Sequence, residues 1–218
     1  TKIAAERGKL YSSHIRSESD DLCGLFPAHA EAIEIGRRTG ARIQISHVKA
    51  VGEKFWGRGN ELIDGMEKAR NEGIDVAGDL YPYEWSSTGF SGAIFPRWAL
   101  VGGREQTLKY LSDSDTRSLI RKDVLYYINR PHSPEGCVVS SFPPDQSMEG
   151  KNLKEISEEM KCEPAEAALR LYEKSEGSYV QHTMELKDVE DLMKWPLMAI
   201  ASDGSSMRDE GPLSSGKP

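Results

Sequence analysis

The sequence predicts an α/β protein built on a parallel sheet, and two observations carry this prediction. Short β-prone runs alternate in the first third of the chain with segments whose apolar residues recur at helical spacing. Connections of this length are typical of right-handed βαβ units, which place successive strands side by side and parallel. We therefore expect strands near residues 9–14, 42–48 and 74–81 to be neighbours, with a further strand near 197–203.

The first two predicted strands are each followed by a helix. KLYSSHI alternates small and branched residues after Gly8, and FPAHAEAIEIGRRT at 26–39 has helical spacing up to Gly40, a residue suited to a left-handed cap. The pattern then repeats. ARIQISHVK predicts a strand, NELIDGMEKARNEG predicts a helix with one apolar face, and IDVAGDLYPY predicts the next strand.

The middle of the chain follows a different pattern. EWSSTGFSGAIFPRW has neither period and predicts a long loop. Helices are expected over 104–128 and on both sides of Pro164, with a short strand at 138–141. LKDVEDLMKW predicts a last amphipathic helix before the strand in MAIASDG. We interpret residues 1–218 as one partial α/β domain, with a helical insertion over about 84–190.

Composition narrows the choice of partners and compartment. A net charge of -7 and a pI near 5.4, with no local basic patch, argue against binding to nucleic acid or to an anionic membrane. No apolar run approaches the roughly 20 residues that span a bilayer. Three cysteines without metal-binding or disulfide spacing favour a reducing cytoplasm. The chain begins with Thr1 inside a helical pattern, so we expect a piece of a longer protein.

Two stretches share one design, YSSHIR and IQISHVK. Each ends a predicted strand in Ser-His, and a cation follows two residues after the histidine. Arg16 thus follows His14, and Lys49 follows His47, at the same spacing. Asp203 closes the last predicted strand in the same way. Because the carboxyl ends of parallel strands carry the active sites of such folds, the two imidazoles and the carboxylate should converge. Their ligand chemistry suits zinc or a similar divalent cation.

Other interpretations stay open for these residues. A single histidine at a strand end is more often satisfied by a hydrogen bond than bound to metal, and each cation is more often a surface or ion-pair partner than a ligand-binding group. A serine nucleophile from Ser12, Ser13, Ser46 or Ser202 finds no support, because no G-x-S-x-G elbow occurs. We interpret His29 and His132 as structural and keep His182 as a reserve ligand.

The quoted motifs carry a family resemblance. YSSHIRSES, AIEIGRRTGARIQISHVKAVG, GIDVAGDLYPYEWSSTG and MAIASDGSS, in this order, resemble the second half of the N-acyl-D-amino-acid deacylases, or D-aminoacylases, of the amidohydrolase superfamily. The resemblance implies the second half of a metal-dependent (β/α)8, TIM-like barrel. It implies that His14 and His47 bind zinc and that Asp203, beside the metal, is the general base and acid. It also implies that the tyrosine stretch and the loop after it line the substrate pocket. Arg16 and Lys49 are candidates by position to bind the substrate carboxylate, and Tyr83 and Ser87 are candidates by their place in this loop.

What the resemblance implies for function is hydrolysis of the amide in N-acyl-D-amino acids. The chain departs from the family pattern, because it has no His-x-His pair and no matching cysteine or glutamate ligand. We therefore expect these residues alone to be inactive. Two alternatives remain, an amidohydrolase acting on another C–N bond, such as a cyclic amide, and a non-catalytic binding or assembly module. Exposed sheet edges would favour a homo-oligomer.

Overall fold

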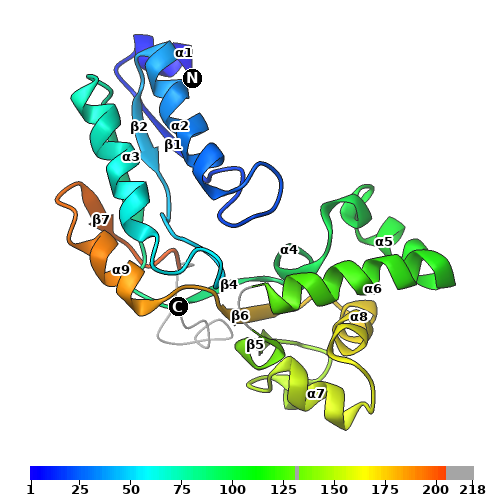
Figure 1. Ribbon diagram of the computed structural model, residues 1–218. Helices are drawn as coiled ribbons and strands as arrows, with labels where there is room; N and C mark the ends of the chain where they lie inside the picture. The colour runs from blue at the N-terminus through cyan, green and yellow to red at the C-terminus, as the bar shows by residue number, and fades with distance from the viewer. Residues whose placement is uncertain (131–132, 205–218) are drawn as a thin grey trace, which may run out of the picture. The chain divides into compact units, whose positions relative to one another are not determined.

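The computed structural model describes residues 1–130 and 133–204. The chain divides into two compact units, one formed by Thr1–Glu84 with the segment from Met184 onward, the other by Trp85–Thr183 (Figure 1). Each unit has its own cluster of buried apolar side chains. Within the described residues, no helix is both long and apolar enough to cross a membrane.

The first unit contains a parallel sheet in the order β1-β2-β3-β7. Its strands are β1 (Leu10–Ser13), β2 (Arg42–Ile45), β3 (Val76–Leu80) and β7 (Met198–Ile200). Its helices are α1 (Lys2–Glu6), α2 (Leu25–Thr39), α3 (Gly59–Asn71) and α9 (Leu186–Met193). The predicted α/β fold with a parallel sheet is confirmed, although each strand is shorter than expected because residues at one or both of its ends belong to loops.

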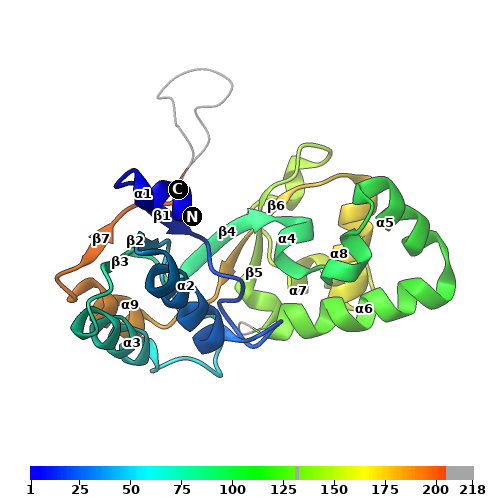
Figure 2. The ribbon, with the colours of Figure 1, turned by 90° about the horizontal axis from the view of Figure 1, so that it is seen from above.

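Helices α2, α3 and α9 cover one face of this sheet (Figure 2). Alternate strand residues point to that face, so Ile43, Ile45 and Val76 are at most 1 % exposed. Burial of each such side chain contributes roughly 1.5–3 kcal/mol. Gly78 lies in the same layer, where a Cβ atom would come within 2.9 Å of the Met198 sulfur. The absence of a side chain at position 78 therefore lets β7 pack closely on β3.

The opposite face of the sheet is polar. Ser12 and Ser46 are hydrogen-bonded at 2.8 Å, and Gln44 donates to the Asp79 carboxylate at 2.7 Å. Above the carboxyl ends of the strands, the loops after β1 and β2 are joined by main-chain and side-chain bonds. The Val51 N–H donates to the Glu18 carbonyl at 2.9 Å. The sheet and these bonds thus fix the segments in which the candidate site residues lie.

The second unit has a separate antiparallel sheet in the order β4-β6-β5. Its strands are β4 (Trp85–Gly89), β5 (Cys137–Ser141) and β6 (Ser178–His182). Its α-helices are α4 (Phe90–Ile94), α5 (Gly103–Ser112), α6 (Ser114–Asn129), α7 (Leu153–Glu159) and α8 (Pro164–Lys174). Its 3-10 helices are η1 (Arg97–Leu100), η2 (Pro134–Gly136) and η3 (Gln146–Met148).

The prediction of a long loop for EWSSTGFSGAIFPRW is wrong. Its first residues form β4, which pairs antiparallel with β6, and the next form α4. WSSTG has no apolar alternation to indicate a strand, and its partner lies far along the chain. The two helices around Pro164 were expected, and the proline stands at the start of α8, where its missing N–H costs no helical hydrogen bond.

Candidate metal centre

The structure brings His14 and His47 together beyond the ends of two neighbouring parallel strands. His14 directly follows β1, and His47 lies two residues beyond β2. Nδ1 of His14 is 2.8 Å from Nε2 of His47, and the rings meet at an interplanar angle of 64° with centroids 4.7 Å apart. The His14 side chain is 64 % exposed and that of His47 is 14 % exposed. Two imidazole nitrogens therefore face each other at a site that solvent can reach.

Glu18 joins this pair, and nothing in the sequence had singled it out. Its Oε1 lies 2.8 Å from Nδ1 of His47 and 3.8 Å from Nδ1 of His14. Within residues 1–130 and 133–204, the group of ligand-type side chains with donor atoms within 4.8 Å of one another is His14, Glu18 and His47. Two imidazoles and a carboxylate form a donor set that fits zinc.

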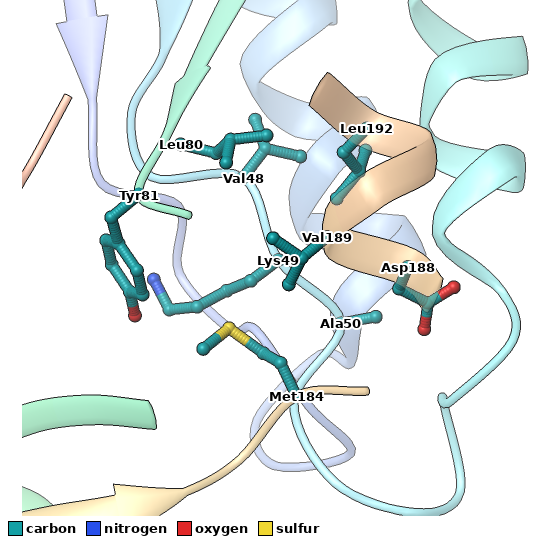
Figure 3. Close-up of a pocket in the computed structure, with 9 residues that line it drawn as sticks. All are labelled: Val48, Lys49, Ala50, Leu80, Tyr81, Met184, Asp188, Val189 and Leu192. Atoms are coloured by element: carbon teal, nitrogen blue, oxygen red, sulfur yellow. The ribbon is translucent and has the colours of Figure 1, made fainter. Parts of the chain in front are cut away.

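Lys49 places a buried ammonium group beside these side chains. Its Nζ is 2.6 Å from Glu18 Oε1, 2.9 Å from the His47 carbonyl oxygen and 2.7 Å from His47 Nδ1. Its stem passes a small cavity lined by apolar side chains, among them Leu80, Met184 and Val189, and it extends toward Tyr81 (Figure 3). The ammonium lies 5.2 Å from the centre of the Tyr81 ring. Water is therefore largely replaced around this cation by a carboxylate, a carbonyl and an aromatic face.

The charges of this group are coupled. Burial by itself would raise the pKa of Glu18, but the Lys49 ammonium and the hydrogen bond from His47 outweigh it and lower that pKa. Burial lowers the pKa of Lys49, and the Glu18 carboxylate opposes this shift. Burial also raises the pKa of Tyr81, with the charges of Glu18 and Asp203 adding to the effect. The glutamate is thus held as an anion and the tyrosine as a neutral phenol.

Asp203 follows β7, and its charge reaches the same neighbourhood. It raises the pKa of both Lys49 and Tyr81, although it lies outside the group of three ligand-type side chains. Its φ is 52°, and that of His47 is 40°. Residues other than glycine rarely adopt this left-handed backbone conformation, because it costs on the order of 1–3 kcal/mol. Where such strained residues occur, they are often found at functional sites.

The other predicted substrate contacts lie in different surroundings. Arg16 is exposed and bound through two nitrogens to Glu31, at 2.6 and 3.0 Å. Tyr83 is 39 % exposed and stacks on Tyr81 with ring centroids 6.0 Å apart. Ser87 lies in β4 of the second unit. Of the predicted substrate-binding residues, Lys49 is thus the one in direct contact with the histidine pair within the described structure.

The remaining histidines lie elsewhere. His29 is buried in α2 with no hydrogen-bond partner at Nε2, and burial lowers its pKa to about 4. His182 belongs to β6 and packs against the Trp85 ring, with centroids 5.1 Å apart. His132, interpreted as structural from the sequence, lies outside the described residues.

Part of this chain is similar in sequence to curated proteins, and most of it is similar in fold to solved structures. Over 87 residues, or 40 % of this chain and 17 % of the relative, it is 41 % identical to N-acyl-D-glutamate deacylase of Alcaligenes xylosoxydans xylosoxydans. It is 37 % identical over 86 residues, 39 % of this chain and 16 % of the relative, to N-acyl-D-aspartate deacylase of the same organism. No protein-family model matches the chain.

Solved structures match a longer segment. The N-acyl-D-glutamate deacylase of Bordetella bronchiseptica, solved with zinc and a phosphonate inhibitor, superposes with a TM-score of 0.68 and 27 % identity over 93 % of this chain. A D-aminoacylase superposes with a TM-score of 0.64 and 22 % identity, which shows a shared fold. The chain spans 34 % of each of these structures. The comparisons confirm that the resemblance read in the sequence, to the N-acyl-D-amino-acid deacylases and D-aminoacylases, holds for both sequence and fold.

Proposed function

We propose that the protein to which this chain belongs hydrolyses the amide bond of N-acyl-D-amino acids with the help of a divalent metal ion. Zinc is the first metal to test. One observation carries the proposal. His14 and His47 present facing nitrogens 2.8 Å apart beyond neighbouring parallel strands, in a chain whose relatives are deacylases. N-acyl-D-glutamate is the first substrate to test, because the relative of that name is 41 % identical.

For the fold, we propose that β1, β2, β3 and β7 are the last four strands of a (β/α)8 barrel. Their parallel order and the likeness over 93 % of the chain, which spans 34 % of the solved relative, support this. In such a barrel the active site lies at the carboxyl ends of the strands, where His14, His47 and Asp203 follow β1, β2 and β7.

Each of these residues has a separate role in the proposed reaction. His14 and His47 would hold the metal, with Glu18 beside them. When bound, zinc supplies Lewis acidity, which polarises a carbonyl and makes water a nucleophile near neutral pH. Asp203 takes the proton of the attacking water and returns it to the departing nitrogen, which must be protonated because an amide anion is too poor a leaving group.

Substrate binding is assigned to the cation beside the histidines. The Lys49 ammonium lies 2.7 Å from Nδ1 of His47, so it is the first candidate to hold the carboxylate of an acylated amino acid bound at the histidine pair, in competition with Glu18. Arg16 is the second candidate, and its guanidinium is bound to Glu31 as the Lys49 ammonium is bound to Glu18. Tyr83 and Ser87 remain proposed contacts to the rest of the substrate.

An assay of the full-length protein tests this function. N-acetyl-D-glutamate, N-acetyl-D-aspartate and their L enantiomers are offered before and after removal of metal by a chelator. Hydrolysis of a D substrate, lost on chelation and restored by zinc, is expected. Residues 1–218 alone should show little turnover, because their sequence offers no His-x-His pair. Failure to cleave any D substrate, or cleavage that survives chelation, would contradict the proposal.

The matched relatives described above are all deacylases and do not favour a cyclic-amide hydrolase or an assembly module.

A further inference from the structure

Asp79 of β3 is bonded to the turn that carries His47. Its Oδ1 accepts the main-chain N–H of His47 at 2.7 Å, and its main-chain carbonyl accepts the N–H of Val48 at 2.7 Å. Its second carboxylate oxygen, Oδ2, accepts from Nε2 of Gln44 at 2.7 Å. Two consecutive amides of the turn after β2 are therefore attached to one residue of the neighbouring strand.

The turn at His47 needs such support. With φ at 40°, the residue lies in the left-handed region, which side chains other than glycine occupy only where the surroundings hold them. An anionic acceptor makes a stronger hydrogen bond to an N–H than a neutral one does. In this backbone conformation the His47 imidazole turns its Nε2 toward His14. The bond to Asp79 is thus part of what aims the ring.

A direct role for Asp79 in metal binding or proton transfer fits the geometry less well. Both of its carboxylate oxygens already accept hydrogen bonds, one from His47 and one from Gln44. The residue is also absent from the group of ligand-type side chains found in the described part of the chain. Its contacts are those of a group that holds another residue in place.

We propose that Asp79 is a positioning residue, which fixes the main-chain turn at His47 so that the two imidazoles meet, while Gln44 orients the Asp79 carboxylate. The consequence for metal affinity rests on the proposed function. The turn itself does not, so the two can be tested separately.

The first experiment needs no metal. Amide hydrogen exchange of the 218-residue chain is followed by NMR for the parent and for Asp79→Ala. The His47 amide should exchange at least about 10-fold faster in the variant, since it loses its acceptor. The Val48 amide is the internal control, because its acceptor is the main-chain carbonyl of residue 79 and is retained. Unchanged exchange at His47, or equal acceleration at both amides, would overturn the proposal.

The second experiment measures zinc affinity by competition with a chromogenic chelator. Asp79→Ala should weaken binding about 10- to 100-fold, the usual loss for a residue that supports a ligand. The double variant Asp79→Asn with Gln44→Glu exchanges the carboxylate and the amide, keeps the net charge, and leaves an oxygen acceptor for the His47 N–H. It should bind zinc within about 3-fold of the parent.

The outcomes separate the two proposals. Parent-like zinc binding in Asp79→Ala, or a folded double variant as weak as Asp79→Ala, would overturn the positioning role. A parent chain that binds no zinc would instead count against the proposed metal site, and amide exchange would still decide the role of Asp79. If Asp79→Ala does not fold, Asp79→Asn takes its place in the exchange experiment. It should accelerate the His47 amide by at least about 2-fold relative to Val48, and equal rates at the two amides would overturn the proposal.

Discussion

Nδ1 of His14 lies 2.8 Å from Nε2 of His47, although 33 positions separate the two residues in the chain. The contact arises because β1 and β2 are parallel neighbours in register, with Ser13 opposite Ile45. Each strand ends within two residues of its histidine, so the two rings meet above the same edge of the sheet. Glu18 and Lys49 then occupy the Nδ1 side of His47.

Replacement of Lys49 should weaken substrate binding in the full-length enzyme. Lys49→Met removes the buried cation proposed to hold the substrate carboxylate, so KM for N-acetyl-D-glutamate should rise about 10- to 100-fold, which corresponds to loss of a charged hydrogen bond. Arg16→Met is the matched control, since Arg16 also pairs with a glutamate, whereas Lys49 is the cation that contacts His47. Steady-state kinetics of both variants measure this. An equal rise of KM in both variants, or a rise confined to Arg16→Met, would contradict the assignment of the substrate carboxylate to Lys49.

The Glu18–Lys49 pair should also affect stability in a non-additive way. Lys49→Met leaves the Glu18 carboxylate, whose side chain is 18 % exposed, without its ammonium partner and should cost about 3 kcal/mol in the free energy of unfolding. Adding Glu18→Gln removes the stranded charge and should recover much of that loss. Urea unfolding of the parent, both single variants and the double variant gives the coupling. Strict additivity would show that the two charges do not depend on each other.

His29 should make stability depend on pH. Burial lowers its pKa to about 4, so the unfolded chain, whose histidine has a pKa near its ordinary 6.5, binds the proton first as the pH falls. Stability from this group is present above pH 6.5 and is lost as the pH falls toward 4. Between pH 7 and 5 the loss attributable to His29 should be about 2 kcal/mol. Urea unfolding at both values should show a smaller loss in His29→Leu than in the parent, and equal losses would contradict the assignment.

Asp203→Asn in the full-length enzyme should abolish turnover but keep most of the metal. The amide is nearly isosteric with the carboxylate but cannot accept and return a proton, so kcat should fall about 10²- to 10⁴-fold. Metal content and kcat are measured on the same preparation. A normal kcat at full metal occupancy would show that the aspartate after β7 has another role.

The parallel sheet could be expected from the sequence, because alternating βα units place successive strands side by side. The meeting of the two histidines could also be expected, because each motif places a histidine at the carboxyl end of its strand. The role of Glu18 could not. It stands among other acidic residues, and its place depends on the bond between its carbonyl and Val51 in the next loop. Asp79 did carry a signal, a charge inside the strand VAGDL, but its acceptor role depends on the left-handed turn at His47. β4 was missed because its pairing with β6 is long-range.

The central claim is that His14 and His47 form a metal site, and the most direct measurement is the zinc content of the full-length protein after dialysis against buffered zinc. His14→Ala and His47→Ala are compared with the parent and with His182→Ala, whose ring packs against Trp85 in the second unit. We expect the first two variants to lose zinc and turnover together, while His182→Ala and the parent retain both. Full zinc occupancy in His14→Ala and His47→Ala would contradict it.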